Sequence, residues 1–288
     1  NGLGAFISAM FLSKLILSGT HYTRETLPMD YPGGWQAYIQ VETDAMKFPY
    51  LVLALLLIAI AVIFVFSKLP KIGDEENKAN ASGEKLIDFG VLKHSHLRWG
   101  VIAQFFYVGV QIMCWTFIIQ YGTRLFMAEG MAEQEAEVLS QKYNIVAMVI
   151  FCISRFVCTF MLRFINPGML LKILAIAGAC FTMGVIFFQN ILGLYCLVAV
   201  SACMSLMFPT IYGIALNKLG DDAKFGAAGL IMAILGGSVL PPLQASIIDM
   251  HTVFGMPAVN VSFVLPFICF IVIIIYGHRS YARSKMLK

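Results

Sequence analysis

Charged residues are scarce in this chain of 288 residues. Asp, Glu, Lys and Arg together make up 12% of it, whereas about 25% is usual in soluble domains. Hydrophobic residues make up 59%, and the mean hydropathy is +0.82. The net charge of +4 is spread over short polar segments rather than gathered on one basic face, so no nucleic-acid partner is expected. The composition excludes an ordinary soluble protein and indicates a membrane protein.

Carboxylates are absent from the middle of every long apolar run. The 16 Asp and Glu residues fall in the polar segments between the runs or at the end of a run. A proton-driven carrier commonly needs a buried carboxyl group whose pKa changes with its access to water. Either this protein is not proton-driven, or its coupling group lies outside this sequence.

Motifs for covalent chemistry and for metal binding are also missing. The seven cysteines lie inside apolar runs and form no CxxC pair, so buried free thiols are expected. His94 and His96 have no third ligand beside them, and no phosphate loop, zinc-binding helix motif or nucleophile elbow is present. We therefore expect no metal, no prosthetic group and no enzymatic activity.

Long apolar runs dominate what is present. A helix rises about 1.5 Å per residue, so about twenty residues cross a hydrocarbon core of about 30 Å. Backbone polar groups in lipid must bond internally, so each run is expected to be a helix. The runs are 1–18, 48–67, 99–121, 143–165, 168–188, 191–216, 225–248 and 257–277. The predicted fold is an all-α polytopic membrane protein with about eight transmembrane helices.

Composition and loop charge divide the chain into three parts. Residues 1–67 hold two helices and an external loop, with a short interfacial helix expected at 34–44. Residues 68–97 are charged, small and poor in aromatics, which is typical of a linker. Residues 98–288 form a six-helix block, as in one half of a two-half transporter. Most Lys and Arg lie in alternate loops, which places those loops and the C-terminus in the cytoplasm.

Four amphipathic side chains share one face of the run 99–121. They are Gln104, Tyr107, Gln111 and Trp115. Their spacing of three, four and four residues aligns them along a helix. Glutamine is costly in hydrocarbon unless it meets a partner or water, and amides beside an aromatic ring suit sugar hydroxyls. We favour a binding face, with hydrogen bonding between helices as the alternative.

Two further features predict gating or structural roles. Arg155 lies deep in an apolar run, where arginine is costly. We assign it to gating or to an interhelical network rather than to direct substrate contact. Gly236, Gly237 and Pro241 interrupt the seventh run, which is typical of a hinge. Close helix packing explains the glycines equally well.

The stretch Gln104–Gln111, with Cys114 and Trp115, resembles the seventh helix of the bacterial L-fucose permeases. These permeases belong to the fucose–galactose–glucose group of proton symporters in the major facilitator superfamily. Ser154 replaces the glycine of a Gly-Arg-Phe motif in their eighth helix. Further matches lie at Arg155-Phe156, Pro209–Ile211, Leu219–Gly226 and Ile234–Gly237 with Pro241.

The resemblance extends over almost the whole chain and implies a major facilitator fold that lacks its first four helices. Asn1 then matches a fifth-helix asparagine that faces the sugar cavity in the family. The family's coupling carboxylates, on helices one and four, have no counterpart here. The sugar contacts expected on this basis are Asn1, Gln104, Tyr107, Gln111 and Trp115, together with Tyr212 and Gln244.

The expected function is secondary active transport, with proton-coupled uptake of L-fucose or a related neutral monosaccharide by alternating access. A glucose/galactose-type carrier of the same group and a non-transporting membrane sugar sensor are the alternatives. The expected partners are a sugar and the lipid bilayer, with the proton as coupling ion. The expected state is a monomer in the bacterial inner membrane, crossing it several times.

Overall fold

The structure is a computed structural model, and the chain falls into two compact units that are described separately. One unit covers residues 7–86, and the other covers 1–6 and 87–288. The described residues are 32, 34–66, 95–217, 219–220, 223–250, 252–253 and 255–286. The first apolar run, Asn1 and most of the predicted linker lie outside the described residues. The division into three domains therefore stays a prediction.

The smaller unit contains one long described helix, α2, at Gly34–Phe66. We predicted a short interfacial helix at 34–44 and a separate span from residue 48, and this separation is wrong. Residues 36–48 contain neither glycine nor proline, and the helix continues through Pro49 as well. Gly34, with a φ of +66°, stands at the start of the helix. The apolar stretch of α2 is Tyr50–Ile63.

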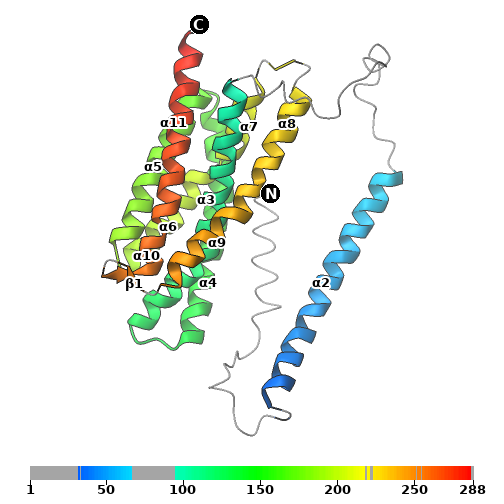
Figure 1. Cartoon of the computed structure of the whole chain (residues 1–288), viewed down its shortest axis with the longest axis vertical. Coiled ribbons are helices and arrows are strands. Elements are labelled where there is room, and N and C mark those ends of the chain that lie inside the picture. The colour runs from blue at the N-terminus through cyan, green and yellow to red at the C-terminus, as the bar shows by residue number, and fades with distance from the viewer. Residues whose placement is uncertain are drawn as a thin grey trace. The chain divides into compact units, whose positions relative to one another are not determined.

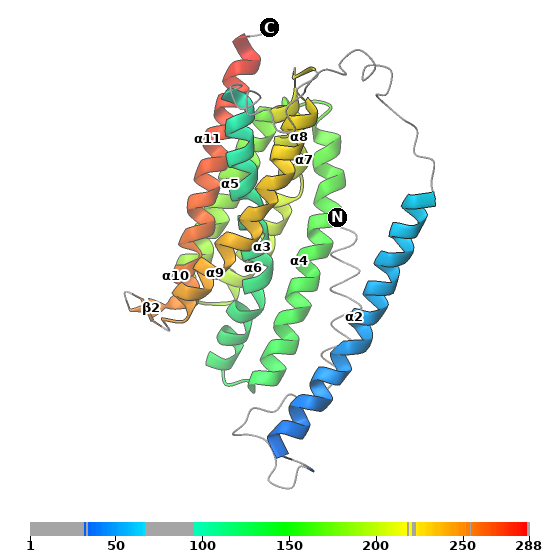
Figure 2. The ribbon, with the colours of Figure 1, turned by 45° about the vertical axis from the view of Figure 1, so that its right-hand side comes forward.

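The larger unit is a helical bundle (Figures 1 and 2). Among the described residues it has six helical segments long and apolar enough to cross a membrane, which confirms the six spans predicted here. The first three are α3 (Ser95–Ala128), α4 (Glu133–Met161) and α5 (Pro167–Phe187). The fourth joins α6 (Ile191–Met204) to α7 (Met207–Leu216), and the fifth joins α8 (Ala223–Met232), η3 (Ala233–Leu235) and α9 (Gly236–Ile248). The last joins α10 (Ala258–Ser262) to α11 (Val264–Met286), after the short hairpin of β1 (Thr252–Val253) and β2 (Met256–Pro257).

Local sequence signals explain where several of these helices begin. Asn166 precedes α5, and its side-chain oxygen accepts a hydrogen bond from the Gly168 N–H at 3.0 Å. Asn190 caps α6 in the same way, through the Leu192 N–H at 3.0 Å. Gly130, with a φ of +92°, provides the left-handed turn between α3 and α4. These short caps and turns keep successive helices adjacent and antiparallel.

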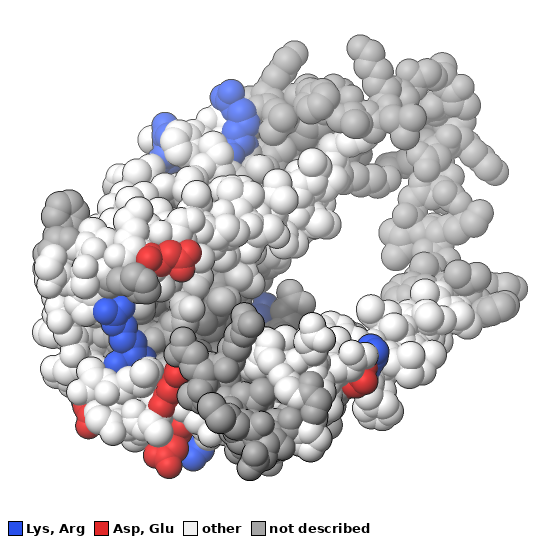
Figure 3. Space-filling view, turned by 60° about the horizontal axis from the view of Figure 1, so that its bottom comes forward, with Lys and Arg blue, Asp and Glu red and all other residues white. Residues whose placement is uncertain are grey.

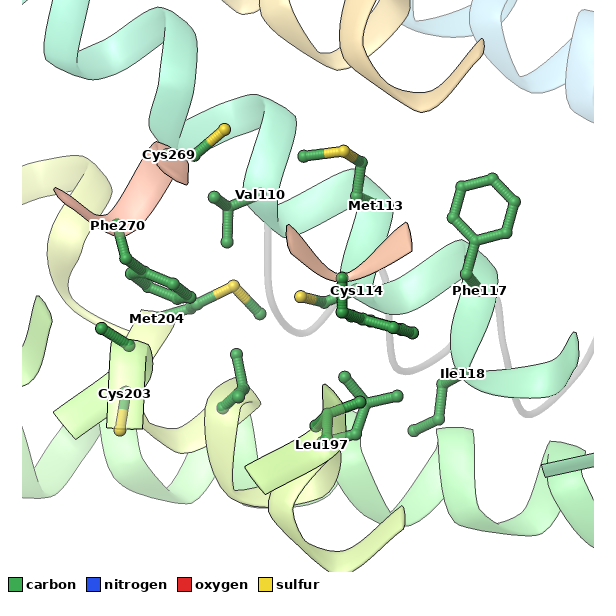
Figure 4. Close-up of a cluster of buried hydrophobic side chains, with 14 of the residues drawn as sticks. Val110, Met113, Cys114, Phe117, Ile118, Leu197, Cys203, Met204, Cys269 and Phe270 are labelled. Carbon is green, nitrogen blue, oxygen red and sulfur yellow. The ribbon is translucent and has the colours of Figure 1, made fainter. Parts of the chain in front are cut away.

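Helix α3 lies at the centre of the bundle and contacts most of the other helices, including α4, α6, α7, α9 and α11. Its buried residues Met113 and Cys114 belong to one hydrophobic cluster with Leu197 and Met204 of α6 and Phe270 of α11 (Figure 4). Lipid tails are as apolar as these side chains, so packing rather than water exclusion holds the helices together. A side chain on α3 is therefore positioned by several neighbouring helices at once.

Charge is sparse on the part of the surface that the structure describes. In Figure 3 the described charged residues form small separate groups, and most of the described surface in that view carries none. Large apolar side chains are exposed along the helices, such as Phe156 at 81% and Phe160 at 59%. An apolar flank with charges in small groups is the surface expected of a bundle surrounded by lipid.

Candidate functional site

The four side chains predicted to share one face of α3 differ in depth. Gln104 and Tyr107 are completely buried in the bundle, whereas Gln111 and Trp115 are partly exposed. The stripe of polar and aromatic groups therefore begins inside the packed bundle and reaches its surface further along α3. Asn1, the fifth expected contact, lies outside the described residues.

Tyr107 is fixed by a break between two neighbouring helices. Its hydroxyl donates a hydrogen bond to the Met204 carbonyl oxygen at 2.9 Å. Met204 is the last residue of α6, and Pro209 in α7 lacks the N–H that a continuous helix would need. Pro209 therefore accounts for the break, and the Tyr107 hydroxyl bonds a carbonyl at that break.

An aromatic series connects Tyr107 to Tyr212, another of the expected sugar contacts. The Tyr107 ring meets Phe208 edge-on, with ring centroids 6.2 Å apart. Phe208 then stacks on Tyr212 with an interplanar angle of 9° and a centroid distance of 6.4 Å. Tyr212 is partly exposed. The structure thus brings two predicted residues from different helices together through an intermediate ring.

Gln104 is the most unusual polar group in the bundle. Its side chain is 0% exposed, and neither its amide nitrogen nor its amide oxygen has a hydrogen-bond partner among the described residues. Leaving a buried polar atom unpaired costs about 1–3 kcal/mol. Such groups are rare in native proteins and each calls for an explanation.

Trp115 lies further along the same face of α3 and packs against α4. Its ring meets Phe151 edge-on at a centroid distance of 5.0 Å. The indole N–H is buried and has no hydrogen-bond partner among the described residues. Gln111, one turn away, is partly exposed. This part of the stripe therefore offers an aromatic plane, an amide and an indole donor.

Arg155 lies on α4 and is partly buried. No carboxylate of the described residues lies within ion-pair distance of it. Both roles predicted for Arg155, in gating and in an interhelical network, stay predictions.

Gln244 and Asn260 form hydrogen bonds between helices at the end of the bundle near the β1–β2 hairpin. Gln244 is buried on α9, and its amide nitrogen donates to the Ser262 hydroxyl at 3.0 Å. The Asn260 amide donates to the Val185 carbonyl at 3.0 Å and approaches the Tyr121 hydroxyl at 3.4 Å. We missed Asn260 in the sequence, although an amide inside an apolar run was the same signal that singled out Gln104.

The interruption predicted in the run 225–248 is present as the 3-10 turn η3 between α8 and α9. It lies immediately before Gly236, and Pro241 follows inside α9. A Cβ atom on Gly236 would lie 2.0 Å from the Phe105 carbonyl oxygen, and one on Gly237 would lie 3.0 Å from Val108. The glycines therefore permit α9 to lie against the backbone of α3. Their use as a hinge stays a prediction.

The hydroxyl of Tyr107 provides a test of local structure. We expect Tyr107→Phe to lower the free energy of unfolding by about 1 kcal/mol, because the Met204 carbonyl loses its donor while the ring remains. Denaturant titration of the purified protein in detergent measures this change. Tyr212→Phe is the matched control, since the Tyr212 hydroxyl has no hydrogen bond among the described residues. Equal stability of wild type and Tyr107→Phe would contradict the structural bond.

Comparison with protein-family models finds no match, whereas known proteins and solved structures give clear similarities. The L-fucose-proton symporter of Haemophilus influenzae is 42% identical over 298 residues, covering 100% of this chain and 66% of that protein. The crystal structure of FucP, a major facilitator superfamily transporter in the outward conformation, has 28% identity and a TM-score of 0.71, covering 97% of this chain and 65% of that one. The chain belongs to the major facilitator superfamily.

Within this superfamily, the relatives include carriers for more than one sugar. The glucose/galactose transporter of Brucella abortus is 27% identical, covering 96% of this chain and 60% of that protein. This chain therefore spans about two thirds of the length of its relatives or somewhat less. The predicted major facilitator fold is confirmed, and so is the expectation of a transporter family rather than an enzyme family.

Proposed function

We propose that the complete protein takes up L-fucose or a related neutral monosaccharide together with protons. The observation that carries this proposal is Gln104, a fully buried amide with no partner among the described residues, on the central helix of a bundle similar to FucP. Two sugar hydroxyls would satisfy the two atoms of this amide. A neutral sugar needs amides and rings rather than charged clamps, and α3 offers these groups.

In this proposal the sugar lies along α3, between this half and the other half of the transporter. Gln111 supplies an amide, Trp115 supplies a ring and an N–H, and Tyr212 borders the site; all three are partly exposed. Gln104 and Tyr107 are 0% exposed in this state, so in this proposal they reach the sugar once the helices around α3 separate. Gln244 is the weakest member, because its amide nitrogen already bonds Ser262. Alternating access would then move one half against the other around the sugar.

Proton coupling is assigned to groups outside this sequence. The described membrane helices carry no buried carboxylate that could exchange a proton between the two sides. Two relatives are named as L-fucose-proton symporters, which supports the coupling ion. We also propose that the protein is a monomer. We place its C-terminus in the cytoplasm, because most Lys and Arg lie in the alternate loops on the same side of the membrane as the C-terminus.

Sugar identity is tested by competition. We expect the complete protein in proteoliposomes to accumulate labelled L-fucose when an inward proton gradient is imposed. Unlabelled L-fucose should suppress this uptake at concentrations at least about tenfold lower than glucose or galactose, a difference worth about 1.4 kcal/mol in binding. Stronger suppression by glucose or galactose would favour the other carriers of the group. Sugar binding without uptake would favour a sensor.

A further inference from the structure

A cavity lies at the end of the bundle where α3 begins and α11 ends, near the C-terminus marked in Figure 1. Its volume is about 550 Å³. The beginnings of α3 and α5 and the ends of α7 and α11 line it. None of its lining residues belongs to the predicted sugar contacts. It is therefore separate from the stripe on α3.

The charge of this cavity has one sign. Arg279 and Arg283 line it, and no Asp or Glu of the described residues does. They lie four residues apart on α11, a spacing at which two like charges destabilise a helix. Neither arginine has an ion pair with any residue in the described part of the chain. Two helices begin at the cavity and two end there, so their dipoles oppose each other and the guanidinium groups decide the sign.

The wall of the cavity is held in place by direct contacts. The Arg279 guanidinium lies over the ring of Trp99, 4.5 Å from its centroid. The Asn166 amide donates to the Ser284 hydroxyl at 2.6 Å, which ties the start of α5 to the last turns of α11. A Cβ atom on Gly168 would lie 2.8 Å from the Tyr281 backbone nitrogen, so these two helices also meet closely. The arginines therefore project from a fixed frame.

We propose that this cavity binds a phosphate group. Guanidinium groups match the geometry of phosphate oxygens and bind them through paired hydrogen bonds. The hydroxyls of Ser95 and Ser284 add further donors to the lining. Such an anion would offset the repulsion between Arg279 and Arg283. The phosphate comes either from the headgroup of an anionic phospholipid or from a soluble phosphate, since both present the same oxygens.

Trp99 provides the reporter for the test, because it lines the cavity and contacts Arg279. The chain contains three tryptophans, so Trp35→Phe with Trp115→Phe leaves Trp99 as the single fluorophore. The full chain in neutral detergent is titrated with inorganic phosphate, with phosphatidylglycerol or with phosphatidylcholine. We expect saturable changes in Trp99 fluorescence with phosphatidylglycerol, with phosphate or with both, and none with phosphatidylcholine. A response to the lipid alone identifies a headgroup site, and a response to phosphate alone identifies a soluble ligand.

Arg283→Gln is the decisive variant, because Arg283 lines the cavity without contacting the reporter ring. We expect it to weaken the apparent affinity at least about fivefold, through loss of a charge-assisted hydrogen bond. Arg163→Gln is the matched control, an exposed arginine between α4 and α5 that does not line the cavity. Equal weakening by both variants would show a general surface-charge effect and overturn the site. The absence of any Trp99 response would overturn it as well.

Discussion

Replacing Gln104 by leucine is expected to reduce sugar uptake by at least about twentyfold while leaving the protein as stable as the wild type, or more stable. Gln104 is completely buried and its amide has no partner among the described residues. Leucine removes two unpaired polar atoms from an apolar core at similar size, which is neutral or stabilising. A bound sugar would lose two hydrogen bonds, together about 2 kcal/mol.

The measurements are uptake by the complete protein in proteoliposomes and the unfolding temperature of the same preparation. Gln120→Leu is the matched control, because Gln120 lies on the same helix but is exposed. We expect Gln120→Leu to change neither quantity. Lower stability of Gln104→Leu would indicate that the amide holds the bundle together, and normal uptake would exclude Gln104 from the sugar site.

The combination of the two measurements separates the two explanations that the sequence left open for the stripe on α3. A glutamine that joins two helices stabilises the protein, so its removal lowers stability first and activity as a consequence. A glutamine kept for a ligand is retained at a cost to stability, and its removal affects function alone. Tyr107, whose hydroxyl bonds Met204, is expected to follow the first pattern.

The positions of the six described spans of the larger unit could be predicted from the sequence because they depend on local composition. A run such as 168–188 is apolar enough to be a helix whatever surrounds it, and α5 occupies Pro167–Phe187. The interruption near Gly236 was also visible, since glycine and proline act locally. Helix α2 shows the limit of this reasoning. The polar residues at its start indicated a separate helix, but α2 continues through them and through Pro49 to Phe66.

The depth of each site residue could not be predicted from the sequence. Gln104 and Gln111 are seven residues apart, so an ideal helix places them within about 20° of each other. Yet Gln104 is fully buried and Gln111 is partly exposed. The difference arises from neighbouring helices, which are distant in sequence. The cavity proposed to bind phosphate could not be predicted from the sequence either, because Trp99, Asn166 and Arg279 come together only in the folded bundle.

Gly236→Ala is expected to have the second large effect, lowering the free energy of unfolding by about 2 kcal/mol and abolishing most sugar uptake. The added Cβ atom would lie 2.0 Å from the Phe105 carbonyl oxygen and 2.7 Å from its carbonyl carbon. Backbone atoms cannot rotate away as a side chain can, so η3 and α9 must separate from α3. Overpacking of this kind typically costs about 1–3 kcal/mol.

Gly213→Ala is the matched control, because a Cβ atom on Gly213 meets nothing within 4 Å. Alanine is better than glycine in a helix, so this variant should be as stable as the wild type or slightly more stable. Denaturant titration and proteoliposome uptake are measured for both variants. If Gly236→Ala keeps normal stability but loses uptake, α9 separates readily from α3 and Gly236 acts as a hinge. Normal stability together with normal uptake would show that the close contact with Phe105 matters to neither folding nor transport.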